Sequence, residues 1–152
     1  GYSALLMAQV MPEGASIVTM ENYAPRIAQA RRNFRQASME SRITLMEGDA
    51  GELLGQLSGS YDFIFMDAAK GQYLHWLPQI LRQMDEGAVL FSDNVLQDGD
   101  ILESRFAVQR RDRTIHARMR EYLYELKHRP ELETSVVPVG DGVALSVKRR
   151  IS

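Results

Sequence analysis

Short apolar runs alternate along this chain with longer segments in which apolar residues recur at helical spacing. The runs predict strands at 16–21, 42–46, 61–67 and 87–95. The longer segments predict helices at 3–11, 25–38, 51–57, 73–84 and 101–128, and Ser3 is the expected N-cap of the first. The runs at 132–138 and 143–149 are joined by Gly-Asp-Gly and predict a terminal antiparallel hairpin. This order predicts an α/β protein with a doubly wound sheet.

The predicted strand at 61–67 is the most apolar of these runs and is expected to be buried on both faces of the sheet. It ends at Asp67, and Lys70 follows three residues later. The strand at 87–95 ends in a similar way, with Asp93 and Asn94. Strand carboxyl ends are where open α/β sheets bind their ligands, and these oxygen donors suit Mg²⁺ or a similar divalent cation. The alternative is that the three residues only end strands and cap helices.

Acidic residues also follow the two earlier strands. Glu21 ends the strand at 16–21, and an acid at this position of a nucleotide-binding fold can accept hydrogen bonds from ribose hydroxyls. Asp49 follows the strand at 42–46 and precedes a predicted helix. Glu21 could equally be a solvated strand end, and Asp49 an N-cap.

Composition narrows the class of protein. The 152 residues are enough for one domain, 45% are hydrophobic, and the formal net charge is −2, which indicates neither a general nucleic-acid binder nor a membrane-surface protein. There is no cysteine, signal-peptide pattern or long apolar run, so we expect a cytoplasmic protein without disulfides or thiolate metal sites and without a membrane partner.

The predicted helix at 101–128 combines an apolar face with a concentration of basic residues. The apolar face consists of Val108, Ile115, Met119, Tyr122, Leu123 and Leu126. The basic residues are Arg105, Arg110, Arg111, Arg113, Arg118, Arg120 and His116. They form either a solvated helix face or a surface for a polyanionic substrate, and in the second case Arg110, Arg111 and Arg113 are the candidate contacts.

Six short motifs together resemble the class I O-methyltransferases that depend on S-adenosylmethionine and a divalent metal, the group that includes catechol and caffeoyl-CoA O-methyltransferases. The motifs are GYS at 1–3, Glu21, EGDA at 47–50, DAAKGQY at 67–73, SDNV at 92–95 and VGDGV at 139–143. The resemblance extends along the whole chain and is strongest to bacterial members.

The resemblance implies a role for each matched residue. The cofactor S-adenosylmethionine would be bound by Gly1, Tyr2, Ser3, Glu21, Asp49, Ala50 and Asp67. The metal, Mg²⁺ or another divalent ion such as Mn²⁺ or Ca²⁺, would be bound by Asp67, Asp93 and Asn94. Lys70 would take or steer the proton of the substrate hydroxyl.

In this family a first strand, preceded by N-terminal helices and followed by a glycine-rich loop, lies between the second and fourth strands. The chain begins at Gly1 within the match to the end of that loop. We therefore expect a single methyltransferase domain, 1–152, that is incomplete at its N-terminus and belongs to a longer protein that forms a homodimer.

Two substrates fit metal-assisted methylation of a hydroxyl beside a second oxygen. The first expectation is 5-hydroxyuridine in tRNA, because bacterial relatives include enzymes of that type and the basic segment suits a phosphate backbone. The alternative is a small catechol-like phenol. A third hypothesis, of another class, is a catalytically inactive binding or dimerisation module.

Overall fold

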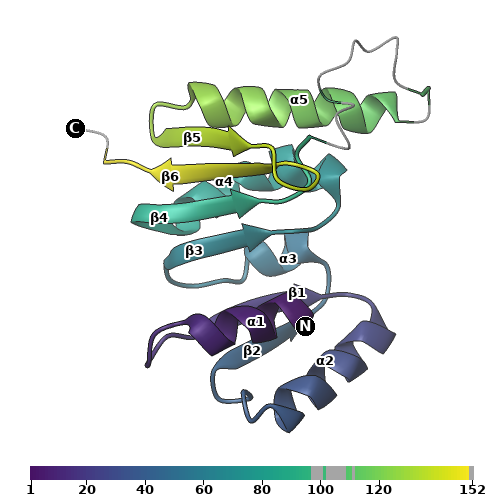
Figure 1. Ribbon diagram of the computed structural model, residues 1–152, viewed down its shortest axis with the longest axis vertical. Coiled ribbons are helices and arrows are strands. Elements are labelled where there is room, and N and C mark those ends of the chain that lie inside the picture. The colour runs from purple at the N-terminus through teal and green to yellow at the C-terminus, as the bar shows by residue number, and fades with distance from the viewer. Residues whose placement is uncertain (97–100, 102–108, 111, 151–152) are drawn as a thin grey trace. The chain divides into compact units, whose positions relative to one another are not determined.

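The computed structural model describes residues 1–96, 101, 109–110 and 112–150 of the chain. The chain forms two compact units, unit 1 from Gly1 to Leu57 and unit 2 from Ser58 to Ser152, and each is described by itself. Both combine helices with strands, which confirms the predicted α/β class (Figure 1). No helix in the described part of the chain is long and apolar enough to cross a membrane.

Unit 1 contains three helices and a two-stranded parallel sheet. In chain order its elements are α1 (Tyr2–Val10), β1 (Ile17–Glu21), α2 (Ala24–Gln36), β2 (Ile43–Glu47) and α3 (Ala50–Leu54). The two strands pair in register from Ile17 with Ile43 to Glu21 with Glu47, so both acids stand at the same end of the sheet. A buried cluster from α1, α2 and β2 forms the core of unit 1, and it consists of Ala4, Ala8, Ala30, Phe34 and Ile43.

The start of α1 differs from the prediction. Gly1, not Ser3, is the N-cap of this helix, and no side chain caps it. A Cβ atom at position 1 would lie 2.9 Å from the Cβ of Ala30 and 3.1 Å from the ring of Phe34. The absence of a side chain at Gly1 therefore lets the chain pass close to α2, and the N-cap lies two residues earlier than the predicted Ser3.

Unit 2 contains a four-stranded mixed sheet in the order β3-β4-β6-β5. In chain order its elements are β3 (Tyr61–Met66), the short 3-10 helix η1 (Lys70–Gln72), α4 (Tyr73–Gln83), β4 (Met84–Ser92), α5 (Arg113–His128), β5 (Leu132–Val137) and β6 (Val143–Lys148). Strands β3 and β4 are parallel, whereas β4–β6 and β5–β6 are antiparallel. The predicted terminal hairpin is thereby confirmed.

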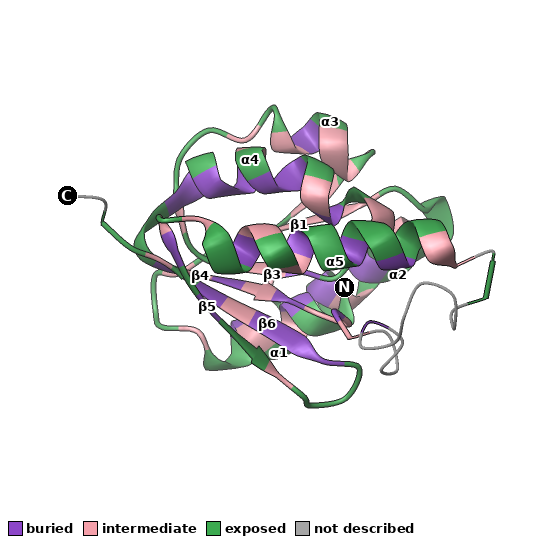
Figure 2. Cartoon of the chain, turned by 90° about the horizontal axis from the view of Figure 1, so that it is seen from above, coloured by how far each residue is buried: buried purple, intermediate pink, exposed green. Residues whose placement is uncertain are grey.

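The two faces of this sheet differ in burial. Helices α4 and α5 cover one face of it (Figure 2). Leu90 and Ser92 of β4 are buried, and Ser92 meets Tyr122 of α5. Phe63 and Phe91 lie on the opposite face and contact each other at a ring distance of 6.4 Å, and Phe63 is 47% exposed. The expectation that β3 is buried on both faces is therefore wrong, because the alternation of a strand places Phe63 on the face opposite to α4 and α5.

Helix α5 is shorter than the predicted helix at 101–128. Gln109, Arg110 and Asp112 are not helical, and the helix begins at Arg113. The expected core position Ile115 is 39% exposed, whereas His116 is 2% exposed. The buried face instead follows His116, Met119, Tyr122 and Leu126. Val108, which was also predicted to lie in the core, is outside the described residues.

Candidate active site

The segment after β3 brings Asp67, Lys70 and Tyr73 together in unit 2. Asp67 follows the last residue of β3, η1 begins at Lys70, and α4 begins at Tyr73. The Nζ atom of Lys70 lies within hydrogen-bond distance, 2.9 to 3.3 Å, of four acceptor oxygens, which share its three N–H donors. These acceptors are Asp67 Oδ1 at 3.3 Å, Tyr73 Oη at 2.9 Å, the Asp93 main-chain oxygen at 3.2 Å and Asn94 Oδ1 at 2.9 Å. Lys70 is thus the point on which the two strand ends converge.

Tyr73 holds Lys70 in place and connects it to the end of β3. Its side chain is fully buried, and its hydroxyl accepts from the Ala68 amide at 3.2 Å and from Lys70 while donating to the Met66 carbonyl at 3.0 Å. A hydroxyl has one donor and two acceptor sites, so these three bonds satisfy it completely. Burial raises the pKa of Tyr73, and the hydrogen bond from Lys70 opposes that shift.

The loop after β4 presents Asn94 through an uncommon backbone conformation. Asn94 has φ of 55°, a left-handed value that Asn tolerates better than most residues. Asp93 Oδ1 accepts from the Asn94 amide at 2.8 Å, so one oxygen of this carboxylate is used within its own loop. Asp93 therefore meets Lys70 with its main-chain oxygen, whereas Asp67 and Asn94 meet it with side-chain oxygens.

Asp141, which the sequence did not single out for a role, orients the amide of Asn94. Asn94 Nδ2 donates to Asp141 Oδ2 at 3.0 Å, which leaves Oδ1 directed at Lys70. The turn that carries Asp141 also holds the loop, because the Val95 amide donates to Gly142 O at 3.0 Å and the Leu96 amide to Asp141 O at 2.9 Å. Asp141 stands in the motif VGDGV, which was therefore the available signal for its importance.

A second pair of buried hydroxyls lies next to this cluster. Ser92, the last residue of β4, and Tyr122 of α5 are both fully buried, and their hydroxyl oxygens are 2.6 Å apart. The Tyr122 ring meets the Tyr73 ring edge to face at 5.4 Å. Burial raises the pKa of Tyr122 well above its usual value, with the hydrogen bond to Ser92 acting in the opposite direction. These contacts connect α5 to the segment that carries Lys70.

The predicted cofactor residues other than Asp67 all lie in unit 1. Glu21 Oε1 accepts from the amides of Asn22 and Tyr23 at 3.1 and 3.0 Å, and its other oxygen is 3.8 Å from Arg26. Asp49 is the N-cap of α3 and accepts from the Gly51 amide at 2.8 Å. Gly1, Tyr2, Ser3 and Ala50 occupy the starts of α1 and α3. Their roles in binding a cofactor stay predictions.

The three predicted substrate arginines have different surroundings. Arg110 is exposed, Arg113 is half-buried and engaged with another group, and Arg111 lies outside the described residues. Arg118, one turn further along α5, donates to the Gly71 carbonyl at 3.2 Å. The basic helix therefore contacts η1, the element that begins at Lys70.

The oxygens around Lys70 have the chemistry that a divalent cation requires. Two side-chain oxygens, Asp67 Oδ1 and Asn94 Oδ1, already converge on a positive charge, and carboxylate and amide oxygens are ligands of Mg²⁺. Within the described ranges no group of three or more His, Cys, Asp or Glu side chains is arranged to hold an ion. A donor set at this place would therefore need the amide of Asn94 beside the carboxylate of Asp67.

Comparison with known proteins finds one family along nearly the whole chain. The model of the O-methyltransferase family matches residues 1–150. A catechol O-methyltransferase of Niastella koreensis is 33% identical over 107 residues, which cover 68% of this chain and 48% of the relative. Caffeoyl-CoA O-methyltransferase 2 of Populus trichocarpa is 29% identical over 155 residues, which cover 95% of this chain and 62% of the relative. The chain thus spans between about half and two thirds of the length of these curated relatives.

Solved structures give the same result for the fold. The crystal structure of the SAH-bound methyltransferase PaMTH1 of Podospora anserina has a TM-score of 0.86 with this chain and 28% sequence identity. The similarity covers 99% of this chain and 68% of that one.

Proposed function

We propose that this chain, which belongs to the O-methyltransferase family, carries the site at which a longer protein transfers the methyl group of S-adenosylmethionine to a hydroxyl that has a second oxygen beside it. The observation that supports this function is the convergence of Asp67, Asn94 and Lys70 within unit 2. An inert binding module would not need a lysine held among oxygens at the ends of two strands. Titration with S-adenosylmethionine in a calorimeter separates the two classes, since an enzyme must bind the methyl donor.

The residues of unit 2 would hold both a divalent ion and the substrate hydroxyl. Asp67, Asp93 and Asn94 are the proposed ligands, and Asp141 keeps the Asn94 oxygen in place. A divalent ion, Mg²⁺ or one such as Mn²⁺ or Ca²⁺, would lower the pKa of a coordinated hydroxyl. Lys70 would steer the departing proton, and Tyr73 holds Lys70 at the site.

In the proposed function, all but one of the residues that would bind the methyl donor S-adenosylmethionine belong to unit 1. Glu21 would accept hydrogen bonds from ribose hydroxyls, while Asp49 and Ala50 at the start of α3 would contact the adenine end. The two hydrogen bonds that Glu21 accepts from main-chain amides fix the orientation of its carboxylate. Gly1, Tyr2 and Ser3, at the start of α1, and Asp67 complete the proposed set. PaMTH1, a relative in fold and sequence, was solved bound to SAH.

A small catechol-like phenol is the substrate that the observations favour. Two relatives, a catechol O-methyltransferase and a caffeoyl-CoA O-methyltransferase, support this class. The second candidate is 5-hydroxyuridine in tRNA, in which the hydroxyl lies beside a carbonyl oxygen. It is supported by the contact of Arg118 with Gly71 next to Lys70, and by the exposed Arg110. A homodimer of the longer protein remains part of the proposal.

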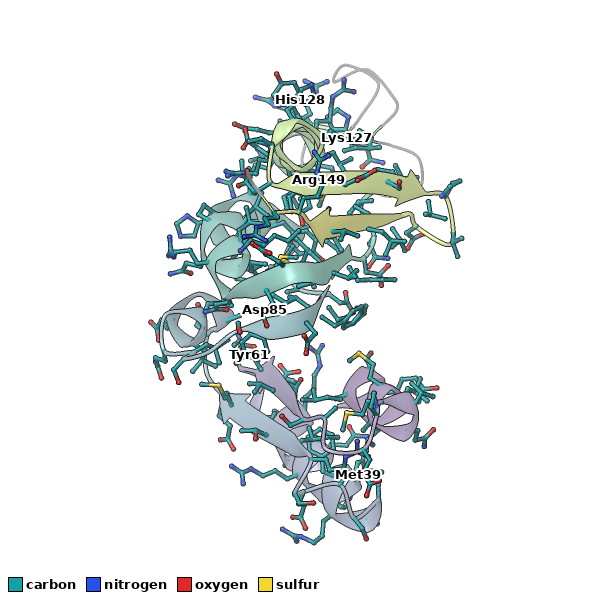
Figure 3. The ribbon with its side chains drawn as sticks, turned by 90° about the vertical axis from the view of Figure 1, so that its left-hand side faces the viewer. Met39, Tyr61, Asp85, Lys127, His128 and Arg149 are labelled. Carbon is teal, nitrogen blue, oxygen red and sulfur yellow. The ribbon has the colours of Figure 1, made fainter. Side chains whose placement is uncertain are left out.

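In the test, purified protein is incubated with S-adenosylmethionine, Mg²⁺ and one of two substrates. These are catechol and tRNA that contains 5-hydroxyuridine. Mass spectrometry then detects the methylated product, before and after removal of metal with EDTA. We expect methylation of catechol, loss of turnover with EDTA or with Asp67→Asn, and little effect of Asp85→Asn on β4 (Figure 3). Methylation of tRNA alone would favour the second candidate, and no binding of S-adenosylmethionine would favour the inert module.

A further inference from the structure

Lys70 lies among the same side-chain oxygens that would bind a divalent ion. We propose that its ammonium group is a built-in cation that competes with the divalent ion for Asp67 and Asn94, so that ion binding displaces Lys70 from both. This inference rests on the proposed metal site and adds to it a mechanism that limits affinity for the ion. The evidence is the set of contacts around Nζ, which lies 3.3 Å from Asp67 Oδ1 and 2.9 Å from Asn94 Oδ1.

All four neighbours of Nζ are hydrogen-bond acceptors. Asp67, Asn94 and Tyr73 supply side-chain oxygens, and Asp93 supplies a carbonyl. Since the Tyr73 hydroxyl uses its proton on the Met66 carbonyl, it also meets Lys70 as an acceptor. An ammonium has three donors and no acceptor, so this surrounding is matched to a cation. The cluster of oxygens therefore already has one positive charge.

A divalent ion and the ammonium cannot keep the same contacts. An ion at the usual distance of about 2.1 Å from Asn94 Oδ1 would lie within about 5 Å of Nζ, given that Nζ is 2.9 Å from that oxygen. Like charges repel strongly at this distance in a partly buried site. The side chain of Lys70 is 21% exposed, so water screens the repulsion only in part. Binding of the ion therefore requires Lys70 to leave Asp67 and Asn94.

The other two contacts of Lys70 differ in kind from those it would lose. Tyr73 Oη and the Asp93 carbonyl are neutral acceptors, and neither is a side-chain oxygen of the proposed ligand set. Lys70 can therefore keep these bonds when it gives up the carboxylate and the amide. Ion binding would in this way release the amine from its ion pair with Asp67, which makes it available to the substrate only when the ion is present.

The test measures the affinity for Mn²⁺ by calorimetry, without cofactor or substrate, in the wild type and in Lys70→Met. Removal of one positive charge from the site should tighten Mn²⁺ binding by about tenfold or more. Lys70→Gln, which keeps donors but removes the charge, should tighten it as well and replaces Lys70→Met if that variant fails to fold. The matched control is Lys127→Met on α5 (Figure 3), because Lys127 carries the same charge but donates to Thr134 O. This variant should bind Mn²⁺ with the affinity of the wild type.

Asp67→Asn, added to Lys70→Met, should abolish the gain, because the ion and the ammonium use the same oxygen. Unchanged or weaker Mn²⁺ binding in both Lys70 variants, with binding still lost in Asp67→Asn, would overturn the competition but leave the proposed metal site intact. Absence of saturable Mn²⁺ binding in the wild type and in every Lys70 variant would overturn the metal site, and the competition with it.

Discussion

Buried hydroxyl groups hold the site residues of unit 2 in place. Tyr73 connects Lys70 to the end of β3, and Tyr122 connects α5 to Ser92 at the end of β4. Both phenols are completely buried, and in each case burial raises the pKa. The sequence showed Tyr122 only as an apolar position of a helix and Tyr73 only as the last residue of the motif DAAKGQY. Spacing predicts which face of a helix is buried but not which polar atom a hydroxyl will meet.

The raised pKa values predict a loss of stability at alkaline pH. The native state keeps the proton of Tyr122 at a pH at which the unfolded chain loses it, so this contribution is fully present below about pH 10 and is lost as the pH rises further. Tyr73 shifts in the same direction. Denaturant unfolding between pH 7 and pH 11 should therefore show a free energy of unfolding that declines above about pH 10.

Tyr122→Phe separates this effect from the hydrogen bond. At pH 7 this substitution should lower the free energy of unfolding by about 1–3 kcal/mol, because Ser92 loses its buried hydrogen-bond partner. The alkaline decline should become smaller, because one buried ionisable group is gone. Tyr124→Phe on the same helix is the control, since Tyr124 is 59% exposed. The free energy of unfolding of this variant should decline with pH as steeply as that of the wild type. A decline that is equally steep in Tyr122→Phe would contradict the assignment.

At the scale of elements, hydrophobic pattern and turn chemistry predicted most helices and strands to within a few residues. The hairpin of β5 and β6 followed from two alternating runs around Gly-Asp-Gly, and Pro25 marked the start of α2. The start of α5 and its buried residue His116 could not be predicted. Ile115 is the more apolar neighbour, and only packing decides that the helix turns His116 inward.

The turn between β5 and β6 also predicts a sensitive position at Gly142. This residue has φ of 82°, and a Cβ atom there would lie 2.6 Å from the Cβ of Leu96. Gly142→Ala should therefore cost the backbone penalty of about 1–2 kcal/mol plus about 1–3 kcal/mol for displacing Leu96. Because the Gly142 carbonyl accepts from Val95, the loop that carries Asn94 should also shift.

Gly87→Ala is the matched control for this substitution. Gly87 has the same φ of 82°, but a Cβ atom there meets nothing within 4 Å. Thermal or denaturant unfolding should show a loss of about 1–2 kcal/mol for Gly87→Ala and a distinctly larger loss for Gly142→Ala. Equal losses in the two variants would mean that the contact with Leu96 has no influence.

At the scale of the whole molecule, the residues with predicted roles are divided between the two units. Unit 1 carries Glu21 and Asp49, and unit 2 carries Lys70, Asp67 and Asn94. The sequence predicted the end of each strand and a doubly wound sheet without its first, central strand, and the described strands form one sheet of two and one of four. Pattern along a chain specifies strands, while pairing depends on which neighbours are available to each edge.

This division predicts that cofactor binding and ion binding respond to different substitutions. Glu21→Gln keeps an oxygen that can accept from the Asn22 and Tyr23 amides but removes the charge that would bind ribose hydroxyls. Since a hydrogen bond to a charged group contributes about 1.5–3 kcal/mol, the affinity for S-adenosylmethionine should fall about tenfold or more. Affinity for Mn²⁺, which depends on unit 2, should not change.

Calorimetric titrations of the same preparation with S-adenosylmethionine and, separately, with Mn²⁺ measure both quantities. Glu40→Gln is the control, because Glu40 is a carboxylate of unit 1 whose ion pair is with Arg35 at 3.4 Å and which has no predicted role in the cofactor site. Its affinity for S-adenosylmethionine should equal that of the wild type. If Glu21→Gln bound S-adenosylmethionine as tightly as Glu40→Gln, Glu21 would be only a strand-end carboxylate that caps two amides, and the cofactor assignment in unit 1 would be wrong.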